Sequence, residues 1–267
     1  MINYKNYYGF TKEPFSQDIK VEDLYIFPAL LSAEERFNFA IDVRAVCIVT
    51  GEVGTGKSTL LRYCISKLHP SLYKVIPVIA NTGSMLEILK QICIALGIDF
   101  SSRSISVLLK NIRDEILDIS RQRRIPVLAV DESQLIRLDV FSQLHTLFQF
   151  EMDSKPIIPI IFAGQNSLID NLIYAKSKPL ASRVVGRSHL EGLKLKEIRT
   201  YLKHHLEIAG INEQLFSDEA INAIHQSSGG FLRRINLLSK GSLIASAKEE
   251  CRVVSAEHVR VASTEII

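Results

Sequence analysis

The segment Gly51–Ser58 of this 267-residue chain spaces glycine, lysine and serine in a way suited to holding phosphate groups. It fits the pattern G-x-x-x-x-G-K-[ST], whose glycines let backbone N–H groups turn towards phosphate oxygens. Lys57 should reach the β- and γ-phosphates, and Ser58 should place its hydroxyl on Mg²⁺. We therefore predict that the chain binds ATP with Mg²⁺. The predicted contacts in this segment are Gly51, Glu52, Val53, Gly54, Thr55, Gly56, Lys57, Ser58 and Thr59.

Two carboxylates, Asp131 and Glu132, follow the apolar run Val127–Val130. Two charged residues at the end of a buried strand cost free energy, unless they have partners or a function there. Asp131 can hold the Mg²⁺ shell, through water, and Glu132 can orient and deprotonate an attacking water. Alone, the pattern also fits a strand followed by a solvated turn. Beside a phosphate-binding loop it predicts hydrolysis of ATP to ADP and phosphate.

Polar and basic residues further along the chain can complete such a site. Gln165 or Asn166, right after the run Ile157–Gly164, can touch the γ-phosphate or the water, although a turn after a strand has the same composition. Arg183 or Arg187 can stabilise charge that develops on the γ-phosphate, and we favour Arg183. Arg233, at the start of a later helix, can reach the same phosphates. For each arginine the competing interpretation is a surface or interdomain ion pair.

Strands that alternate with helices must position these residues. Short β-branched runs predict strands at Ala45–Thr50, Tyr73–Ala80, Ile125–Val130 and Ile157–Ala163. A capping-box pattern at Ser32–Glu35 predicts a helix start there, and further helices are expected after Lys57 and after Ser84, and at 105–119 and Val140–Phe150. This alternation indicates an α/β fold with a parallel sheet covered by helices on both faces.

After about residue 190 the pattern changes to helices alone. They are expected at Leu195–Ile208, Asp218–Gln226 and Leu232–Ala247, with a short one near Ser255. We predict an aromatic N-terminal arm at 1–31, an α/β phosphate-binding domain at 32–190 and a small helical lid domain at 191–267. The neighbours His204 and His205 are expected on the surface of their helix.

Composition limits the other functions. A net charge of +3 permits contact with nucleic acid without arguing for it. No two of the four cysteines have CxxC spacing, so neither a disulfide framework nor a zinc site is expected. The sequence shows no signal peptide pattern and no apolar run near the ~20 residues that span a bilayer. We therefore expect no membrane span and a reducing, cytoplasmic location.

Together these residues resemble the AAA+ ATPases. In that resemblance Gly51–Ser58 corresponds to the Walker A motif and Val127–Glu132 to Walker B. Gln165 or Asn166 looks like sensor 1, Arg233 like sensor 2 and Arg183 like the arginine finger. Asn81, after the second predicted strand, resembles the switch that couples partner binding to the catalytic glutamate. The resemblance implies a three-layer P-loop domain followed by a helical lid.

A narrower resemblance is to the ExeA/GspA-type branch and to transposon helper ATPases of the TnsC, TniB, MuB and IstB kind. It is carried by Tyr7–Phe15, by Asp131–Gln134 with Ser133 in place of alanine, by Phe162–Gln165 and by Gly230–Asn236. It implies an ATP-dependent homo-oligomer, ring or filament, that binds double-stranded DNA and recruits or activates a transposase. The alternative is an ExeA/GspA-like ATPase of a secretion or envelope-assembly system.

Contacts to DNA phosphates are expected to be basic and salt-dependent. The competing interpretation of the basic run 121–124 is a solvated helix end, where positive charge is favourable. The candidate DNA contacts are Thr82, Ser84, Arg103, Lys110, Arg121, Arg123 and Arg124.

Overall fold

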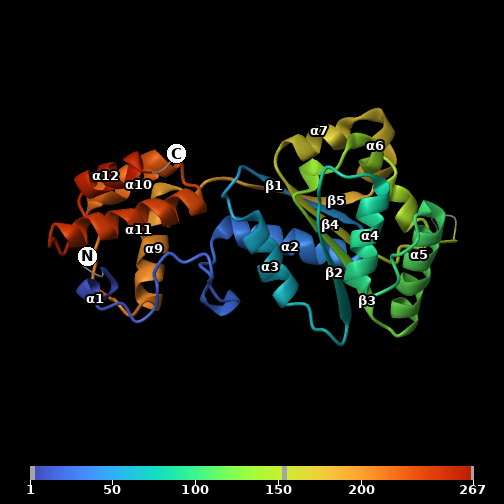
Figure 1. Cartoon of the computed structure of the whole chain (residues 1–267), viewed down its shortest axis with the longest axis horizontal. Coiled ribbons are helices and arrows are strands. Elements are labelled where there is room, and N and C mark those ends of the chain that lie inside the picture. Colours follow the sequence, from blue (N-terminus) through green and yellow to red (C-terminus); the bar gives the residue numbers. More distant parts are fainter. Residues whose placement is uncertain (1–3, 152–154, 266–267) are drawn as a thin grey trace. The chain divides into compact units, whose positions relative to one another are not determined.

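The computed structural model describes residues 4–151 and 155–265, and its contacts divide the chain into two compact units. The sheet unit comprises residues 28–51 and 57–190. The helical unit comprises the chain up to Phe27, residues 52–56, and the chain from Glu191 onward. Figure 1 labels most of the α-helices and the strands of both units. The predicted phosphate-binding loop 52–56 therefore groups with the helical unit, whereas Gly51 and Lys57 on either side of it belong to the sheet unit.

The sheet unit is built on five parallel strands in the order β2-β3-β4-β1-β5. The strands are β1 (Val46–Gly51), β2 (Tyr73–Ile79), β3 (Ile125–Asp131), β4 (Ile160–Gly164) and β5 (Val184–Leu190). Every residue of β1 and β4 is buried, which explains their apolar, β-branched composition. The predicted parallel α/β fold is confirmed.

Helices cover both faces of this sheet. Because strand side chains alternate between faces, Val46 and Ile48 join a core with α4 and α5, whereas Cys47 and Val49 point to the face that carries α2 and α3. The helices and 3₁₀ turns of the unit are α2 (Pro28–Asp42), α3 (Lys57–Ser66), α4 (Met85–Leu96), α5 (Ile105–Arg121), η2 (Ser133–Leu135), α6 (Leu138–Phe141), η3 (Leu144–Phe148), α7 (Ser167–Ile173), η5 (Ala175–Ser177) and α8 (Lys178–Ala181).

The helical unit joins the N-terminal arm to the C-terminal helices. Its elements are α1 (Tyr4–Tyr8), η1 (Val21–Asp23), α9 (Leu195–Ile208), α10 (Asp218–Ser228), α11 (Leu232–Lys248) and α12 (Ala256–Thr264). Backbone N–H and side-chain hydroxyl of Thr11 both donate to the carbonyl of Ala209. Lys240 on α11 forms an ion pair with Glu13 of the arm, and that contact, with a second one from Lys5, lowers the pKa of Glu13 to about 2.

Several predicted boundaries are wrong. Helix α2 begins at Pro28, whose fixed φ suits the first helical turn, so Ser32 lies inside the helix and accepts a hydrogen bond from Arg36. Val140–Phe150 is not one helix but the short α6 followed by η3, and β4 begins at Ile160 rather than Ile157. The predicted strands omitted β5, because alternate residues of this edge strand face solvent and its sequence is partly polar.

The expectation that His205 lies on the surface is also wrong. Its side chain is 4% exposed, because Phe15 of the arm stacks on it at a centroid distance of 5.2 Å and Tyr201 packs beside it. Burial, with a smaller contribution from His204, lowers the pKa of His205 to about 4 from its usual 6.5. His204 is partly buried, and its Nε2 lies 2.8 Å from the Asp23 carbonyl oxygen.

This burial predicts that acid destabilises the protein through His205. Above pH 6.5 the imidazole is neutral in both folded and unfolded chains, so its contribution to stability is complete there. Below pH 6.5 the unfolded chain takes up the proton first, which should cost about 2 kcal/mol by pH 5. Urea denaturation at pH 7.5 and pH 5 should show this loss in the wild type and a smaller loss in His205→Leu. Equal losses in both would contradict the assignment.

Candidate active site

The strand order brings three of the predicted site segments to one edge of the sheet. β4 lies between β1 and β3, and all three strands run in parallel. Their carboxyl ends therefore meet at the same edge, where ligands of open α/β sheets bind. Gly51 ends β1, Asp131 ends β3, and Gln165 follows β4. Gln165 and Asn166 thus follow the strand that lies between the Walker A and Walker B strands.

The middle of the Walker A segment packs against the start of α11. Gly54 and Gly56 have φ angles of +87° and +98°, which favour glycine. The backbone N–H of Arg233 donates to the Gly54 carbonyl at 3.2 Å. A Cβ on Gly54 would lie only 3.0 Å from the Arg233 Cβ. Gly54 therefore permits both the turn and the close approach of the chain that carries Arg233, whose own side chain is exposed.

Lys57 is the first residue of α3, and its side chain is held at the end of β1. Its Nζ donates to the Gly51 carbonyl at 2.9 Å, and the residue is 7% exposed. Ser58, the next residue of α3, is exposed. Backbone N–H groups at a helix start, together with an ammonium group, favour an anion. Thr55 is buried and donates its hydroxyl to the Glu52 carbonyl, which stabilises the loop.

The Walker B carboxylates lie on a tight turn. Asp131 accepts a hydrogen bond at Oδ1 from the Glu132 N–H at 2.8 Å. Glu132 has φ of +53° and ψ of +33°, a left-handed conformation that costs energy for a residue with a side chain. The Ser133 hydroxyl returns to the Val130 carbonyl at 2.8 Å and stabilises this turn. Backbone strain of this kind is typical of functional positions.

One residue that the sequence analysis left without a role, Gln134, contacts the Walker B glutamate directly. Its Nε2 donates to Glu132 Oε2 at 2.6 Å, and its Oε1 accepts from the Gln165 backbone N–H at 2.9 Å. The signal in the sequence was a glutamine two residues after Glu132. Asn81, the predicted switch residue, accepts a hydrogen bond from the Gly83 N–H within its own loop, and its role stays a prediction.

The two candidate arginine fingers lie at and before the edge strand β5. Arg183 is partly buried, and its guanidinium donates to the Pro179 carbonyl in α8. Arg187 is exposed within β5. The finger role requires a neighbouring subunit, so both residues stay predictions.

The predicted DNA contacts do not form one patch. Thr82 and Ser84 follow β2 at the carboxyl edge of the sheet, whereas Arg121, Arg123 and Arg124 precede β3 at the amino edge. A seven-residue strand, roughly 20 Å long, separates these edges.

The other basic candidates lie on or before α5. Arg103 and Lys110 are exposed. Arg121 forms an ion pair with Asp118 at 2.7 Å, and Arg124 donates to Gln122 at 2.6 Å. These local contacts are those expected of a solvated helix end.

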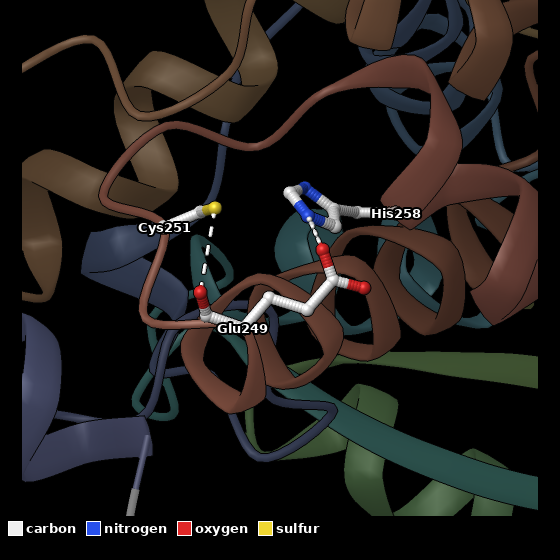
Figure 2. Close-up of side chains that lie close together, drawn as sticks. All are labelled: Glu249, Cys251 and His258. Carbon is white, nitrogen blue, oxygen red and sulfur yellow. Dashed lines mark hydrogen bonds and ion pairs between the residues drawn. The ribbon is translucent and has the colours of Figure 1, made fainter.

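The helical unit gathers one cluster of possible metal ligands that the sequence analysis did not anticipate. Figure 2 shows Glu249 and Cys251, which follow α11, beside His258 of α12. The Ser255 N–H donates to His258 Nδ1 at 3.0 Å, so the neutral ring carries its proton on Nε2 and donates it to Glu249 Oε2, also at 3.0 Å. A metal needs the lone pair of Nε2, so this arrangement fits a helix cap better than a metal site.

Comparisons with known proteins bear on the family and the fold. Residues 41–172 match a family described as AAA domain. General secretion pathway protein A of Aeromonas hydrophila is 29% identical over 245 residues, which cover 91% of this chain and 45% of that protein. This chain therefore spans less than half the length of that relative.

Solved structures show the same fold. Cdc6p of Pyrobaculum aerophilum superposes with a TM-score of 0.74 at 16% identity, over 95% of this chain and 70% of that one. The ORC1 protein of Aeropyrum pernix, solved in complex with DNA, gives 0.69 at 17% identity, over 94% and 68% of the two chains. The match of residues 41–172, the similarity to general secretion pathway protein A and the shared fold together support an AAA+ ATPase of the ExeA/GspA-like branch.

The contact between Gly54 and the start of α11 yields a prediction. Gly54→Ala places a methyl group against Arg233 and also strains a positive φ, so it should destabilise the nucleotide-free protein by about 2 kcal/mol. Gly97→Ala is the matched control, because Gly97 has φ of +80° but open space around its Cβ position, and about 1 kcal/mol is expected. Urea denaturation compares the two variants. Equal destabilisation would mean that the close approach contributes nothing.

Proposed function

We propose that the chain binds ATP with Mg²⁺ and hydrolyses it. The observation that carries the proposal is the arrangement of the carboxyl edge of the sheet, where β4 places Gln165 between the Walker A and Walker B strands. The donors available there suit the ligands. Glycine-freed backbone N–H groups and Lys57 match phosphate oxygens, and the Ser58 hydroxyl and Asp131 carboxylate are oxygen ligands of the kind that Mg²⁺ prefers.

In this proposal each residue has one task. The segment Gly51–Thr59 holds the phosphates, and bound Mg²⁺ would neutralise charge on the β- and γ-phosphates. Glu132 orients the attacking water and accepts its proton, while Gln165 or Asn166 contacts the γ-phosphate. Arg233 is proposed as the lid residue that touches the same phosphates. Arg183 is proposed to act on the nucleotide of a neighbouring subunit in a homo-oligomer.

For the biological role we favour the ATPase of a secretion or envelope-assembly system. The support is the similarity to general secretion pathway protein A, which covers 91% of this chain. Among the described residues, none of the helices has the length and hydropathy needed to cross a bilayer. The hypothesis of a transposition helper that recruits a transposase receives no support from these relatives.

DNA binding is a second candidate, favoured by a separate observation. The ORC1 protein of Aeropyrum pernix and Drosophila ORC were both solved with DNA, and both share this fold. At identities of 17% and 16%, these two structures show a shared fold and not a shared binding partner. The support for DNA binding is therefore weaker than the support for nucleotide hydrolysis.

A pair of substitutions tests the proposed chemistry. Lys57→Ala removes the ammonium from the phosphates and should lower ATP affinity by at least tenfold. Glu132→Gln keeps the shape of the side chain but removes the base, so ATP should still bind while turnover falls about 100-fold or more. Equilibrium nucleotide binding and phosphate release measure the two effects. Wild-type turnover in Glu132→Gln would remove Glu132 from its role.

A filter-binding titration of duplex DNA tests the second candidate. If the chain binds DNA as an ATP-bound oligomer, retention should require ATP and should weaken steeply between 50 and 200 mM salt, on the order of tenfold or more. Arg121→Gln and Arg103→Gln, at separate ends of α5, indicate which surface contributes. Absence of binding at low salt with ATP present would exclude the DNA role.

A further inference from the structure

Gln134 connects the Walker B glutamate to the strand between the two Walker motifs. Its side-chain amide hydrogen-bonds Glu132 Oε2 at 2.6 Å and the Gln165 backbone N–H at 2.9 Å. The orientation of the amide is determined, because the Gln165 N–H can only donate. Oε1 must therefore face Gln165, and the NH₂ group must face the carboxylate.

The main chain around Gln134 is equally constrained. The Leu135 N–H donates to the Glu132 carbonyl at 2.9 Å, which closes the turn that carries Gln134. Gly164, the last residue of β4, allows this turn to approach. A Cβ there would lie 2.7 Å from Gln134 Oε1 and 3.0 Å from its backbone nitrogen. The side chain therefore has little freedom at either end.

The chemical nature of this contact suits a base. An amide NH₂ donates to a carboxylate without neutralising it, whereas a lysine or arginine at the same place would form an ion pair. The bond engages Oε2, one of two carboxylate oxygens, and so directs the other, Oε1, for proton transfer. The backbone at Glu132 is strained, and a fixed side-chain partner restricts the rotamers that this strained residue adopts.

We propose that Gln134 is a positioning residue for hydrolysis, which sets the orientation of the Glu132 carboxylate relative to the segment after β4. When Gln165 shifts on contact with the γ-phosphate, the side-chain amide of Gln134 transmits this shift to the Glu132 carboxylate. This inference rests on the proposed function, because it assumes that Glu132 is the base.

Two substitutions separate the two ends of the contact. Gln134→Met has similar length but loses both hydrogen bonds, whereas Gln134→Glu can still accept from the Gln165 N–H but repels Glu132. Both should lower kcat by about 10- to 100-fold, the range expected for a lost hydrogen bond to a charged group, and leave the KM and the affinity for ATP unchanged. Gln143→Met, at an exposed glutamine nine residues further along the chain, should retain wild-type kcat.

A double-mutant cycle supplies a readout that a purely structural role would not move. In a Glu132→Gln background, Gln134→Met should reduce the remaining turnover by less than twofold, because its effect acts through the Glu132 carboxylate. Wild-type kcat in Gln134→Glu, or full additivity with Glu132→Gln, would overturn the proposal. A fall in ATP affinity or melting temperature that accounts for the lost turnover would also overturn it. If Glu132→Gln alone retains wild-type turnover, the proposed function fails, and that result is distinct from a failure of Gln134.

Discussion

The position of β4 between β1 and β3 is the constraint on which the site depends. Parallel hydrogen bonding of these three strands forces their carboxyl ends to one edge, whatever loops follow them. Because β1 ends in the Walker A segment and β3 in Asp131, the residue after β4 must lie between them. The close approach at Gly164 then lets Gln134 join Gln165 to Glu132. Strand order thus accounts for the convergence of residues that are more than 100 positions apart.

The helical unit depends on a different kind of contact. Its N-terminal arm packs through Phe15, Tyr25 and a backbone contact at Thr11. Burial of His205 beneath Phe15 couples the stability of this packing to pH. The same unit holds residues 52–56, so that Gly54 and the start of α11 share one compact body. The arm, the loop and the lid helices therefore form one structural unit although they come from three parts of the chain.

Much of the fold and part of the site could be predicted from sequence, for physical reasons. β1 and β4 are buried on both faces and read as continuous apolar runs, and the Walker motifs depend on local residue types. β5 was omitted because an edge strand exposes alternate side chains such as Arg187. His205 was misplaced because Phe15, 190 residues away, covers it. The role of Gln134 depends on the register between β3 and β4, which no local pattern contains.

The central claim is that this edge of the sheet hydrolyses ATP with Mg²⁺. Phosphate release from ATP by the purified chain, followed at several protein concentrations with Mg²⁺ and with EDTA, tests it most directly. The account predicts turnover that needs Mg²⁺ and whose rate per chain rises with protein concentration, because Arg183 is proposed to act on the nucleotide of a neighbouring subunit. Tight ATP binding without phosphate release at any concentration, or release that persists in EDTA, would contradict it.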